Sequence, residues 1–183
     1  MGTRSHPTVA NQPFFVTATT ARRRPLFGDP KAAQLLISEI LWSRREMGFA
    51  LLAYVIMPDH IHLIVVPTTG ASLSVVMQGI KGRFARIWNE RAGCKGTMWQ
   101  PRFYESGVRT ESQLVRWVEY IHNNPVEAGL ARTADSYPYS SAFPDAGTDI
   151  EAYMSGSWRG QAAARGQAEA WPSGGSTSGG STP

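Results

Sequence analysis

The sequence predicts an α+β fold: a ferredoxin-like βαββαβ sheet with one added helix on its C-terminal side. First, short runs of β-branched and aromatic residues alternate with segments of helical periodicity in the order strand, helix, strand, strand, helix, strand, helix. Second, only a Pro-Asp turn separates the second and third strands, which makes them an antiparallel hairpin. Third, the chain has 183 residues, 42% of them hydrophobic, enough for one domain with a substantial core.

The first half of the chain contains three of the strands and one helix. Residues 14–20 (FFVTATT) favour extended backbone because β-branched and aromatic residues suit a pleated sheet. Asp29 can cap a helix whose first residue is proline, and Gly48 suits the left-handed position at its end. Strands over 49–57 and 61–67 follow. Their nearly continuous apolar character indicates a sheet covered on both faces, with the third strand in its interior.

The second predicted helix begins after Ser72, which can act as its N-cap, and apolar residues recur along it at helical spacing. Gly79 and Gly82 lie inside this helix, each at a cost of about 1 kcal/mol relative to alanine. Glycines at such positions indicate either tight packing against the sheet or the close approach of another backbone, from protein or nucleic acid.

A short fourth strand over 102–108 and a third helix complete the predicted fold. Thr110 followed by Gln113 is a capping box that begins this helix. Because the Asn124-Pro125 step disfavours helical backbone at Asn124, the helix should end near that residue.

Three segments are expected from the change of composition along the chain. Residues 1–12 should form a flexible N-terminal arm, and residues 13–145 should form the folded domain. Residues 146–183 should be an extension that is largely flexible, because its last part is rich in Gly, Ser and Ala and poor in apolar residues.

The composition excludes several classes of protein. Cys94 is the single cysteine, so no disulfide can form within the chain. No apolar run approaches the roughly 20 residues that span a bilayer, and the N-terminus lacks the apolar segment of a signal peptide. These observations predict a cytoplasmic protein without a membrane partner.

The basic residues suggest a nucleic-acid partner. The chain has 18 Lys and Arg against 14 Asp and Glu, and residues 81–109 hold seven bases against two acids. Within this stretch, Trp99, Phe103 and Tyr104 alternate with bases, as in surfaces that stack unpaired nucleobases. An ordinary solvated surface, with these aromatic residues in the core, is the alternative. The candidate phosphate contacts are Arg22, Arg23, Arg24, Lys81, Arg83, Arg86, Arg102, Arg109 and Arg116.

Two histidines in the third strand are the candidate metal ligands. His60 and His62 are two positions apart, so their side chains lie on one face of the strand. Burial of two imidazoles without partners would be costly, and a divalent metal ion is the simplest partner. Histidines hydrogen-bonded to neighbouring residues are the alternative. Two ligands leave open positions, as a catalytic metal that polarises a phosphate requires.

A tyrosine in the third helix is the candidate nucleophile. At ~100° per residue, Tyr120 falls about 100° away from the buried stripe of this helix. It shares a face with Gln113, Arg116 and Asn124. This position presents the ring beside polar groups instead of packing it into the core.

Three motifs resemble those of the REP-associated tyrosine transposases, relatives of the single-tyrosine insertion-sequence transposases that share a His-hydrophobic-His metal motif. They are MPDHIHLIVVP, WQPRFYESGVR and YIHNNPVEAGL, in that order, and the resemblance covers residues 14–143. It implies that residues 13–145 form a catalytic domain that cleaves and rejoins single-stranded DNA. The implied recognition element is a hairpin-forming repetitive extragenic palindrome.

The resemblance also implies a role for each candidate residue. His60 and His62 would bind Mg²⁺ or Mn²⁺, and Tyr120 would attack the scissile phosphate to form a 5′-phosphotyrosine with a free 3′-hydroxyl. The third ligand would be Asn124, one turn beyond the tyrosine. His122 is the competing candidate, although it could reach the metal only if the helix end were unwound.

The predicted partner is single-stranded or hairpin DNA, without a small-molecule cofactor, for a nucleoid-associated monomer or homodimer. One alternative is a domesticated protein that binds structured nucleic acid without catalysis. A metal-dependent phosphohydrolase with an activated water is another alternative, but it would not explain the position of Tyr120.

Overall fold

The fold was analysed in a computed structural model, which describes residues 12–68 and 71–157. Almost all of the expected N-terminal arm, and residues 158–183 of the expected extension, lie outside the described residues. No helix in the described part of the chain is long and apolar enough to cross a membrane.

The centre of the molecule is a four-stranded antiparallel sheet with the strand order β2-β3-β1-β4. The strands are β1 (Phe14–Thr19), β2 (Ala50–Met57), β3 (His60–Val66) and β4 (Tyr104–Gly107). β3 pairs with β2 on one side and β1 on the other, so the strand with the two histidines lies in the interior of the sheet, as predicted.

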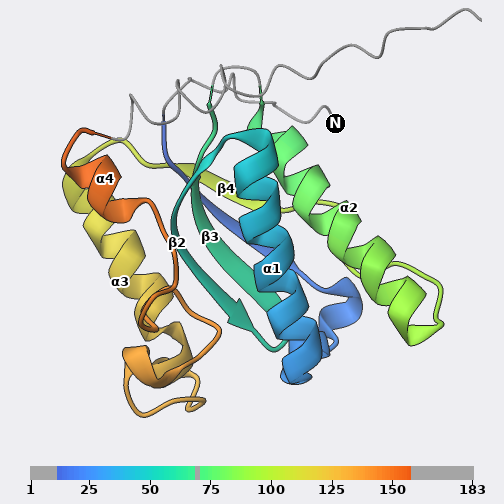
Figure 1. Cartoon of the computed structure of the whole chain (residues 1–183). Helices are drawn as coiled ribbons and strands as arrows, with labels where there is room; N and C mark the ends of the chain where they lie inside the picture. The colour runs from blue at the N-terminus through green and yellow to red at the C-terminus, as the bar shows by residue number, and fades with distance from the viewer. Residues whose placement is uncertain (1–11, 69–70, 158–183) are drawn as a thin grey trace, which may run out of the picture.

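Helices cover both faces of this sheet (Figure 1). Helices α1 (Pro30–Met47) and α2 (Leu73–Ala92) pack on one face, and α3 (Glu111–Glu127) packs on the other. The short helix α4 (Ile150–Met154) contacts β2, and three 3₁₀ turns, η1 (Ala21–Arg23), η2 (Leu26–Gly28) and η3 (Ala134–Ser136), lie in the connections. Every residue of β2 is buried, which confirms the prediction of a sheet covered on both faces.

The predicted helix ends are present. The Asp29 side chain accepts a hydrogen bond from the Lys31 backbone N–H, and Gly48 ends α1 with a φ of 68° in the left-handed region. The Ser72 side chain accepts from the Val75 backbone N–H at the start of α2.

The prediction that the third helix ends near Asn124 is wrong, because α3 continues through Pro125 to Glu127. The conformational restriction before proline is a bias that tertiary packing can overcome. Pro125 is buried, and the Ala128 backbone N–H donates to the Asn124 carbonyl 3.0 Å away, which continues the helical hydrogen bonding beyond the proline. Tyr120 and Asn124 therefore stay one turn apart on one helical face.

The fourth strand is shorter than the predicted span of 102–108 and comprises only Tyr104–Gly107. Pro101, just before this segment, has no N–H for a strand ladder. Upstream, the chain makes only an isolated bridge between Thr20 and Trp99. Residues 94–103 therefore form a loop that runs from the end of α2 to the edge of the sheet.

A strap over residues 137–149 covers the outer edge of β2. The Ile56 N–H donates to the Tyr139 carbonyl at 2.8 Å, and the Asp149 N–H donates to the Leu51 carbonyl at 2.8 Å. An ion pair between Arg44 and Asp149 ties the end of the strap to α1. Packing thus continues past residue 145, the expected end of the domain, and the strap protects an edge that would otherwise expose unpaired backbone groups.

The two glycines inside α2 have different surroundings. A Cβ at Gly79 would lie 3.0 Å from the Met47 sulfur, so this glycine allows close packing of α2 against α1. A Cβ at Gly82 would meet no atom within 4 Å. Tight packing against helix α1, and not against the sheet, therefore accounts for Gly79. Packing does not explain Gly82.

Candidate active site

His60 and His62 lie on the face of β3 that is turned toward α3, while Ile61 and Leu63 pack on the opposite face with α1 and α2. The centroids of the two imidazole rings are 4.8 Å apart. The prediction that both side chains share one face is confirmed.

A carboxylate orients the first of these histidines. His60 Nδ1 lies 2.6 Å from Asp59 Oδ1, and an ionised carboxylate can only accept, so Nδ1 donates in this hydrogen bond and Nε2 is the ring nitrogen left for another partner. The other oxygen of Asp59 accepts from Arg23 at 2.6 Å. Burial alone would raise the pKa of the Asp59 carboxyl, but the hydrogen bonds from His60 and Arg23 hold it below its ordinary value. Asp59 therefore stays ionised at neutral pH.

The second histidine is buried and held by its neighbour on β1. His62 is 5% exposed, and its Nδ1 lies 2.8 Å from the Thr17 hydroxyl, directly across the β1–β3 ladder. Burial, and then the nearby His60, lower the pKa of His62 to about 3. At neutral pH the ring is therefore neutral, the form that binds a metal ion.

Tyr120 lies next to this pair on α3. Its ring centroid is 5.4 Å from that of His62, and its side chain is 39% exposed. Phe15 stacks on His62 at 5.3 Å and on Trp117 at 4.0 Å. This aromatic layer between β1 and α3 holds the tyrosine and the histidines in contact while solvent still reaches the tyrosine.

The two candidates for a third ligand, Asn124 and His122, have different surroundings. Within residues 12–68 and 71–157, no group of three or more His, Cys, Asp or Glu side chains could hold a metal ion, so a third protein ligand there would be of another type. Asn124 is half-buried on the helical face of Tyr120. His122 Nε2 lies 2.9 Å from the Ser141 hydroxyl of the strap, and burial lowers the pKa of His122.

Four contacts of this site were not among the candidates drawn from the sequence: Phe15, Thr17, Asp59 and Trp117. Three of them had a local signal in the chain itself. Asp59 directly precedes His60, and Phe15 and Thr17 share a strand face by their spacing. The pairing of Thr17 with His62, however, depends on the register between two strands 45 residues apart in sequence.

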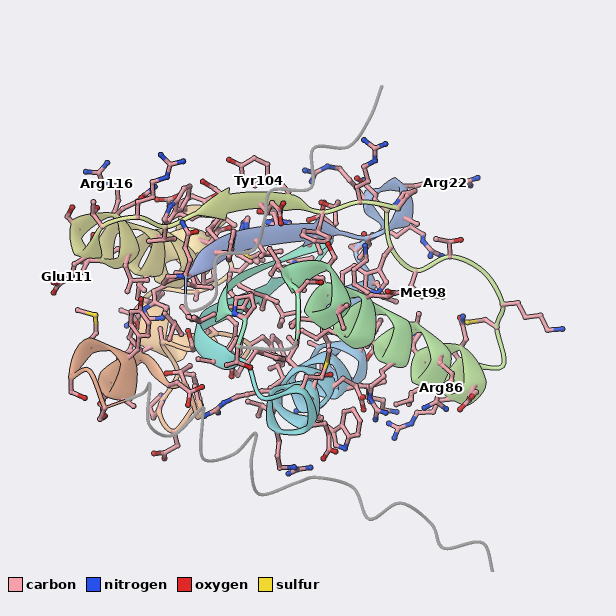
Figure 2. The ribbon with its side chains drawn as sticks, turned by 90° about the horizontal axis from the view of Figure 1, so that it is seen from above. Arg22, Arg86, Met98, Tyr104, Glu111 and Arg116 are labelled. Atoms are coloured by element: carbon pink, nitrogen blue, oxygen red, sulfur yellow. The ribbon has the colours of Figure 1, made fainter. Side chains whose placement is uncertain are left out.

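The candidate phosphate contacts do not form one surface. Figure 2 shows Arg22, Tyr104 and Arg116 along one margin of the molecule, and Arg86 away from it. Arg102 and Arg109, which flank β4, are exposed.

All five of the other basic candidates have partners within the protein. Arg83 donates to Glu39 at 2.8 Å and lies 3.3 Å above the Trp42 ring, on the α1 side of α2. Arg23 pairs with Asp59, as described above, and Arg86 pairs with Glu90 at 3.3 Å. Further contacts are made by Arg24, with the Thr97 carbonyl, and by Lys81, with the Gln100 carbonyl.

Comparison with known families connects this geometry to a class of enzymes. Residues 9–124 match the family described as transposase IS200 like, and this match covers more than half of the chain. The chain belongs to the IS200-like transposase family. The matched segment contains both histidines and Tyr120, and it ends at Asn124.

Two relatives in this transposase family confirm the narrower resemblance. The REP-associated tyrosine transposase of Escherichia coli (strain K12) is 31% identical over 113 residues, which cover 61% of this chain and 66% of the relative. A second relative of the same description, from Haemophilus influenzae, is 30% identical over 112 residues, which cover 56% of this chain and 64% of the relative. The matched region is thus a little under two thirds of the length of each relative.

A solved structure supports the fold. The structure of a REP-associated tyrosine transposase bound to a REP hairpin has a TM-score of 0.65 and 28% identity, and the match covers 77% of this chain and 82% of the other. The predicted α+β class, with helices around a four-stranded antiparallel sheet, is confirmed at that level.

Proposed function

We propose that this protein is a single-stranded DNA transposase that binds hairpin DNA of the REP type and cleaves and rejoins it through a 5′-phosphotyrosine intermediate with the help of a divalent metal ion. The observation that carries the proposal is the contact between Tyr120 on α3 and His62 on β3, with ring centroids 5.4 Å apart. It brings a nucleophile and two potential metal ligands together on facing elements. The relative solved with a REP hairpin supports the same kind of substrate.

The scaffold of the proposed site is a ferredoxin-like βαββαβ unit to which α3 is added as the helix with the nucleophile. Its support is the observed strand order β2-β3-β1-β4, in which β3 and β1 lie in the interior of the sheet. β3 and α3 then face each other across the side of the sheet that α1 and α2 do not cover.

The residues of the site fit Mg²⁺ or Mn²⁺. His60 and His62 would each offer Nε2, because Asp59 and Thr17 occupy the Nδ1 atoms, and the Asn124 carboxamide would supply an oxygen. When bound, such an ion polarises the scissile phosphate. The part of the protein itself is to orient both rings and, at His62, to keep the imidazole neutral.

Tyr120 performs the covalent chemistry in this proposal. Its phenolic oxygen forms a bond to the phosphorus while the bond to the 3′ oxygen breaks, and the strand leaves with a 3′-hydroxyl. Attack by a 3′-hydroxyl on the phosphotyrosine reverses the exchange and rejoins DNA. Because the partial exposure of Tyr120 leaves room for a strand, the site suits a polymeric substrate.

The same proposal places the protein in the cytoplasm, associated with the nucleoid, as a monomer or homodimer. Phosphate contacts are expected from exposed basic side chains for which the described residues offer no acidic partner, namely Arg22 in η1, Arg102 and Arg109 on either side of β4, and Arg116 in α3.

The test is incubation with a labelled hairpin oligonucleotide that carries single-stranded flanks, in the presence of Mn²⁺, followed by a denaturing gel. We expect a protein–DNA adduct with the wild type and with Tyr139→Phe, a control in the strap, and none with Tyr120→Phe. Binding without any adduct would instead identify a non-catalytic binding protein. Cleavage without an adduct would identify a phosphohydrolase.

A further inference from the structure

A contact between α3 and the strap uses a histidine that has no role in the proposed reaction. His122 is half-buried, and its Nε2 lies 2.9 Å from the Ser141 hydroxyl. Ser141 is itself fixed to β2, because its N–H donates to the Tyr54 carbonyl at 2.8 Å and its hydroxyl accepts from the Tyr54 N–H at 2.9 Å. One side chain thus joins α3 to the edge of the same sheet that carries His62.

The direction of this hydrogen bond follows from what each group can donate and accept. The Ser141 hydroxyl has one hydrogen and already accepts from the Tyr54 backbone. Burial lowers the pKa of His122, so its ring is neutral at pH 7 and one ring nitrogen can accept. If Nε2 donated instead, the hydroxyl hydrogen would have no acceptor among the described residues. The Ser141 hydroxyl therefore donates to His122 Nε2.

Tyr120 and His122 flank the buried centre of α3. Ile121, between them, is fully buried and packs against the sheet, and at ~100° per residue its two neighbours project to either side of it. Tyr120 is turned toward β3, where it contacts His62, and His122 is turned toward the strap beyond β2. A rotation of α3 about its axis therefore moves both side chains together.

The turn of α3 that carries these residues depends on support from outside the helix. Pro125 has no N–H, so it cannot donate the helical hydrogen bond to the Ile121 carbonyl four residues earlier. The apolar contacts of Ile121 with the sheet are non-directional and do not by themselves fix the rotation of the helix. A hydrogen bond is directional, so the bond between Ser141 and His122 does fix it.

We propose that His122 and Ser141 are positioning residues, which hold α3 at the rotation that lets the Tyr120 hydroxyl reach the scissile phosphate beside His62. This gives His122 a role that requires no metal ion. The inference rests on the proposed function, because the reaction of Tyr120 gives the rotation its consequence. A displacement of a reacting group by about 1 Å can lower a rate roughly 100-fold. The pair should therefore act on the rate of adduct formation and not on the affinity for DNA.

The first measurement follows the Tyr120 ring in the absence of DNA and metal ions. The full chain is labelled with ¹³C-tyrosine, and the Tyr120 ring signal is assigned from its loss in Tyr120→Phe. Three aromatic rings have centroids 5.4, 5.7 and 5.9 Å from that of Tyr120. Because aromatic rings shift the signals of nearby nuclei, the Tyr120 signal reports the position of its ring.

Three variants separate the hydrogen bond from the loss of the imidazole. His122→Leu and Ser141→Ala each remove one partner, so both should move the Tyr120 signal. In His122→Gln the ring is lost, but the side-chain oxygen can still accept from Ser141, and the signal should stay near its wild-type position. If His122→Leu does not fold, Ser141→Ala decides the same question.

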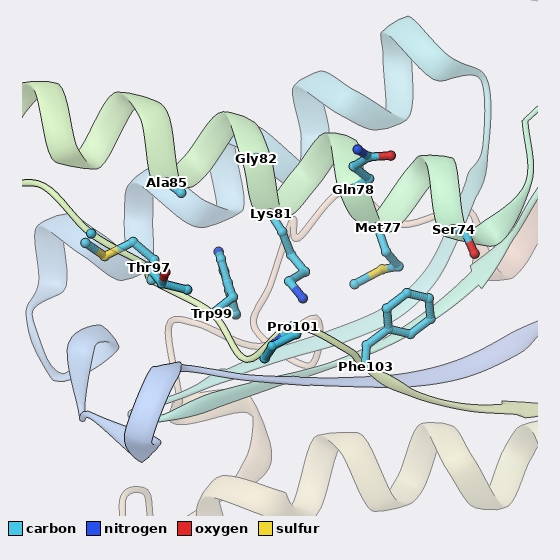
Figure 3. Close-up of a pocket in the computed structure, with 12 residues that line it drawn as sticks. Ser74, Met77, Gln78, Lys81, Gly82, Ala85, Thr97, Trp99, Pro101 and Phe103 are labelled. Carbon is cyan, nitrogen blue, oxygen red and sulfur yellow. The ribbon is translucent and has the colours of Figure 1, made fainter. Parts of the chain in front are cut away.

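The control removes a hydrogen bond of the same strap on the other face of the sheet. The Tyr54 hydroxyl donates to the Ala146 carbonyl at 3.4 Å, and the ring belongs to the core on the α1 and α2 side. That face also has a cavity of about 460 Å³ between α2 and the loop over residues 94–103 (Figure 3), and no residue of α3 lines it. Tyr54→Phe should leave the Tyr120 signal and adduct formation unchanged.

The second measurement is the rate of adduct formation with Mn²⁺ and saturating hairpin DNA, together with the affinity for the same DNA by fluorescence anisotropy. In His122→Leu we expect a rate roughly 10- to 100-fold lower, with an affinity within about twofold of the wild type. His122→Gln should react at nearly the wild-type rate. The double variant of His122→Leu and Ser141→Ala should be no slower than the slower single variant, because the pair acts as one unit.

An unmoved Tyr120 signal in both His122→Leu and Ser141→Ala, or an equal loss of rate in His122→Leu and His122→Gln, would overturn the inference. If the wild type forms the adduct in that case, only the positioning role fails and the proposed function stands. If the wild type forms no adduct, the proposed function fails, and the Tyr120 signal still decides whether the pair positions the ring.

Discussion

At the scale of single residues, two neighbouring side chains orient the two histidines of the proposed metal site. Asp59 holds one ring by an ionised hydrogen bond, and Thr17 holds the other across the ladder between β1 and β3. Both contacts use Nδ1, so both rings direct Nε2 away from their anchors. The alternative of histidines satisfied only by their neighbours accounts for Nδ1 of each ring, and neither Nε2 is among the buried unpaired atoms of the described residues.

Removal of the Asp59 carboxylate should weaken metal binding. In Asp59→Ala the His60 ring loses its fixed tautomer and orientation, and we expect the affinity for Mn²⁺ to fall roughly 10- to 100-fold. Asp59→Asn keeps an acceptor oxygen without the charge and should fall between this variant and the wild type. The fraction of unbound Mn²⁺ measured by electron paramagnetic resonance gives the affinity.

Asp135→Ala, an exposed carboxylate in η3, is the control and should bind Mn²⁺ like the wild type. Equal affinity in Asp59→Ala and the wild type would show that Asp59 does not orient a metal ligand.

The sequence was sufficient to predict the pair of histidines and the tyrosine because strand and helix periodicity are local properties. Period two puts His60 and His62 on one face, and a departure from the buried stripe singles out Tyr120. Thr17 and Trp117 could not be found in that way. Their roles follow from strand register and from the distance between α3 and the sheet, which no local pattern contains.

At the scale of elements, the continuation of α3 and the strap were the features least accessible from the sequence. Local preference predicts a helix end before Pro125, and only packing against the sheet and the later hydrogen bond to the Asn124 carbonyl maintain the helix. The contacts of the strap with β2 could not be predicted from local sequence, because they join residues more than 80 positions apart.

The stability that the strap contributes should decrease at alkaline pH. Tyr137 is 8% exposed and its hydroxyl donates to the Ile56 carbonyl at 2.9 Å. Burial, and then the neighbouring Tyr139, raise the pKa of Tyr137 to about 12. An unfolded tyrosine ionises near pH 10, so unfolding releases a proton above that pH. The contribution of Tyr137 is therefore complete below pH 10 and is lost as the pH rises toward 12.

In urea titrations of the wild type, ionisation of Tyr137 should lower the free energy of unfolding by on the order of 1 to 3 kcal/mol between pH 10 and 12. Tyr137→Phe should lose about 1 kcal/mol at neutral pH, because the hydrogen bond is gone, and should decline less at high pH. Tyr104→Phe removes the hydroxyl of a tyrosine that is 59% exposed, and its free energy of unfolding at neutral pH should equal that of the wild type. An alkaline decline in Tyr137→Phe as steep as in the wild type would contradict this explanation.

At the scale of the whole molecule, the sheet separates the proposed cleavage site from a second hollow. The cleavage site lies between the sheet and α3, and a cavity lined in part by Trp99 lies beside α2 on the other face. Some basic residues that lie close together in the sequence have partners within the protein. Arg83 is the clearest example, because Glu39 and Trp42 hold it on the α1 side.

This division predicts which basic residues set the salt dependence of DNA binding. Arg22 in η1 and Arg116 in α3 lie along one margin of the molecule with Tyr104 of β4 between them, and we expect a strand that reaches Tyr120 to pass there. Each phosphate contact releases condensed counterions, so Arg22→Gln and Arg116→Gln should each weaken hairpin binding and lower the slope of log affinity against log salt by roughly 1. Fluorescence anisotropy with a labelled hairpin oligonucleotide, repeated at several salt concentrations, gives both quantities. Arg45→Gln removes another exposed charge, on α1, and should leave the slope unchanged. A slope that falls equally in all three variants would mean that the DNA senses only net charge and that the margin is not its path.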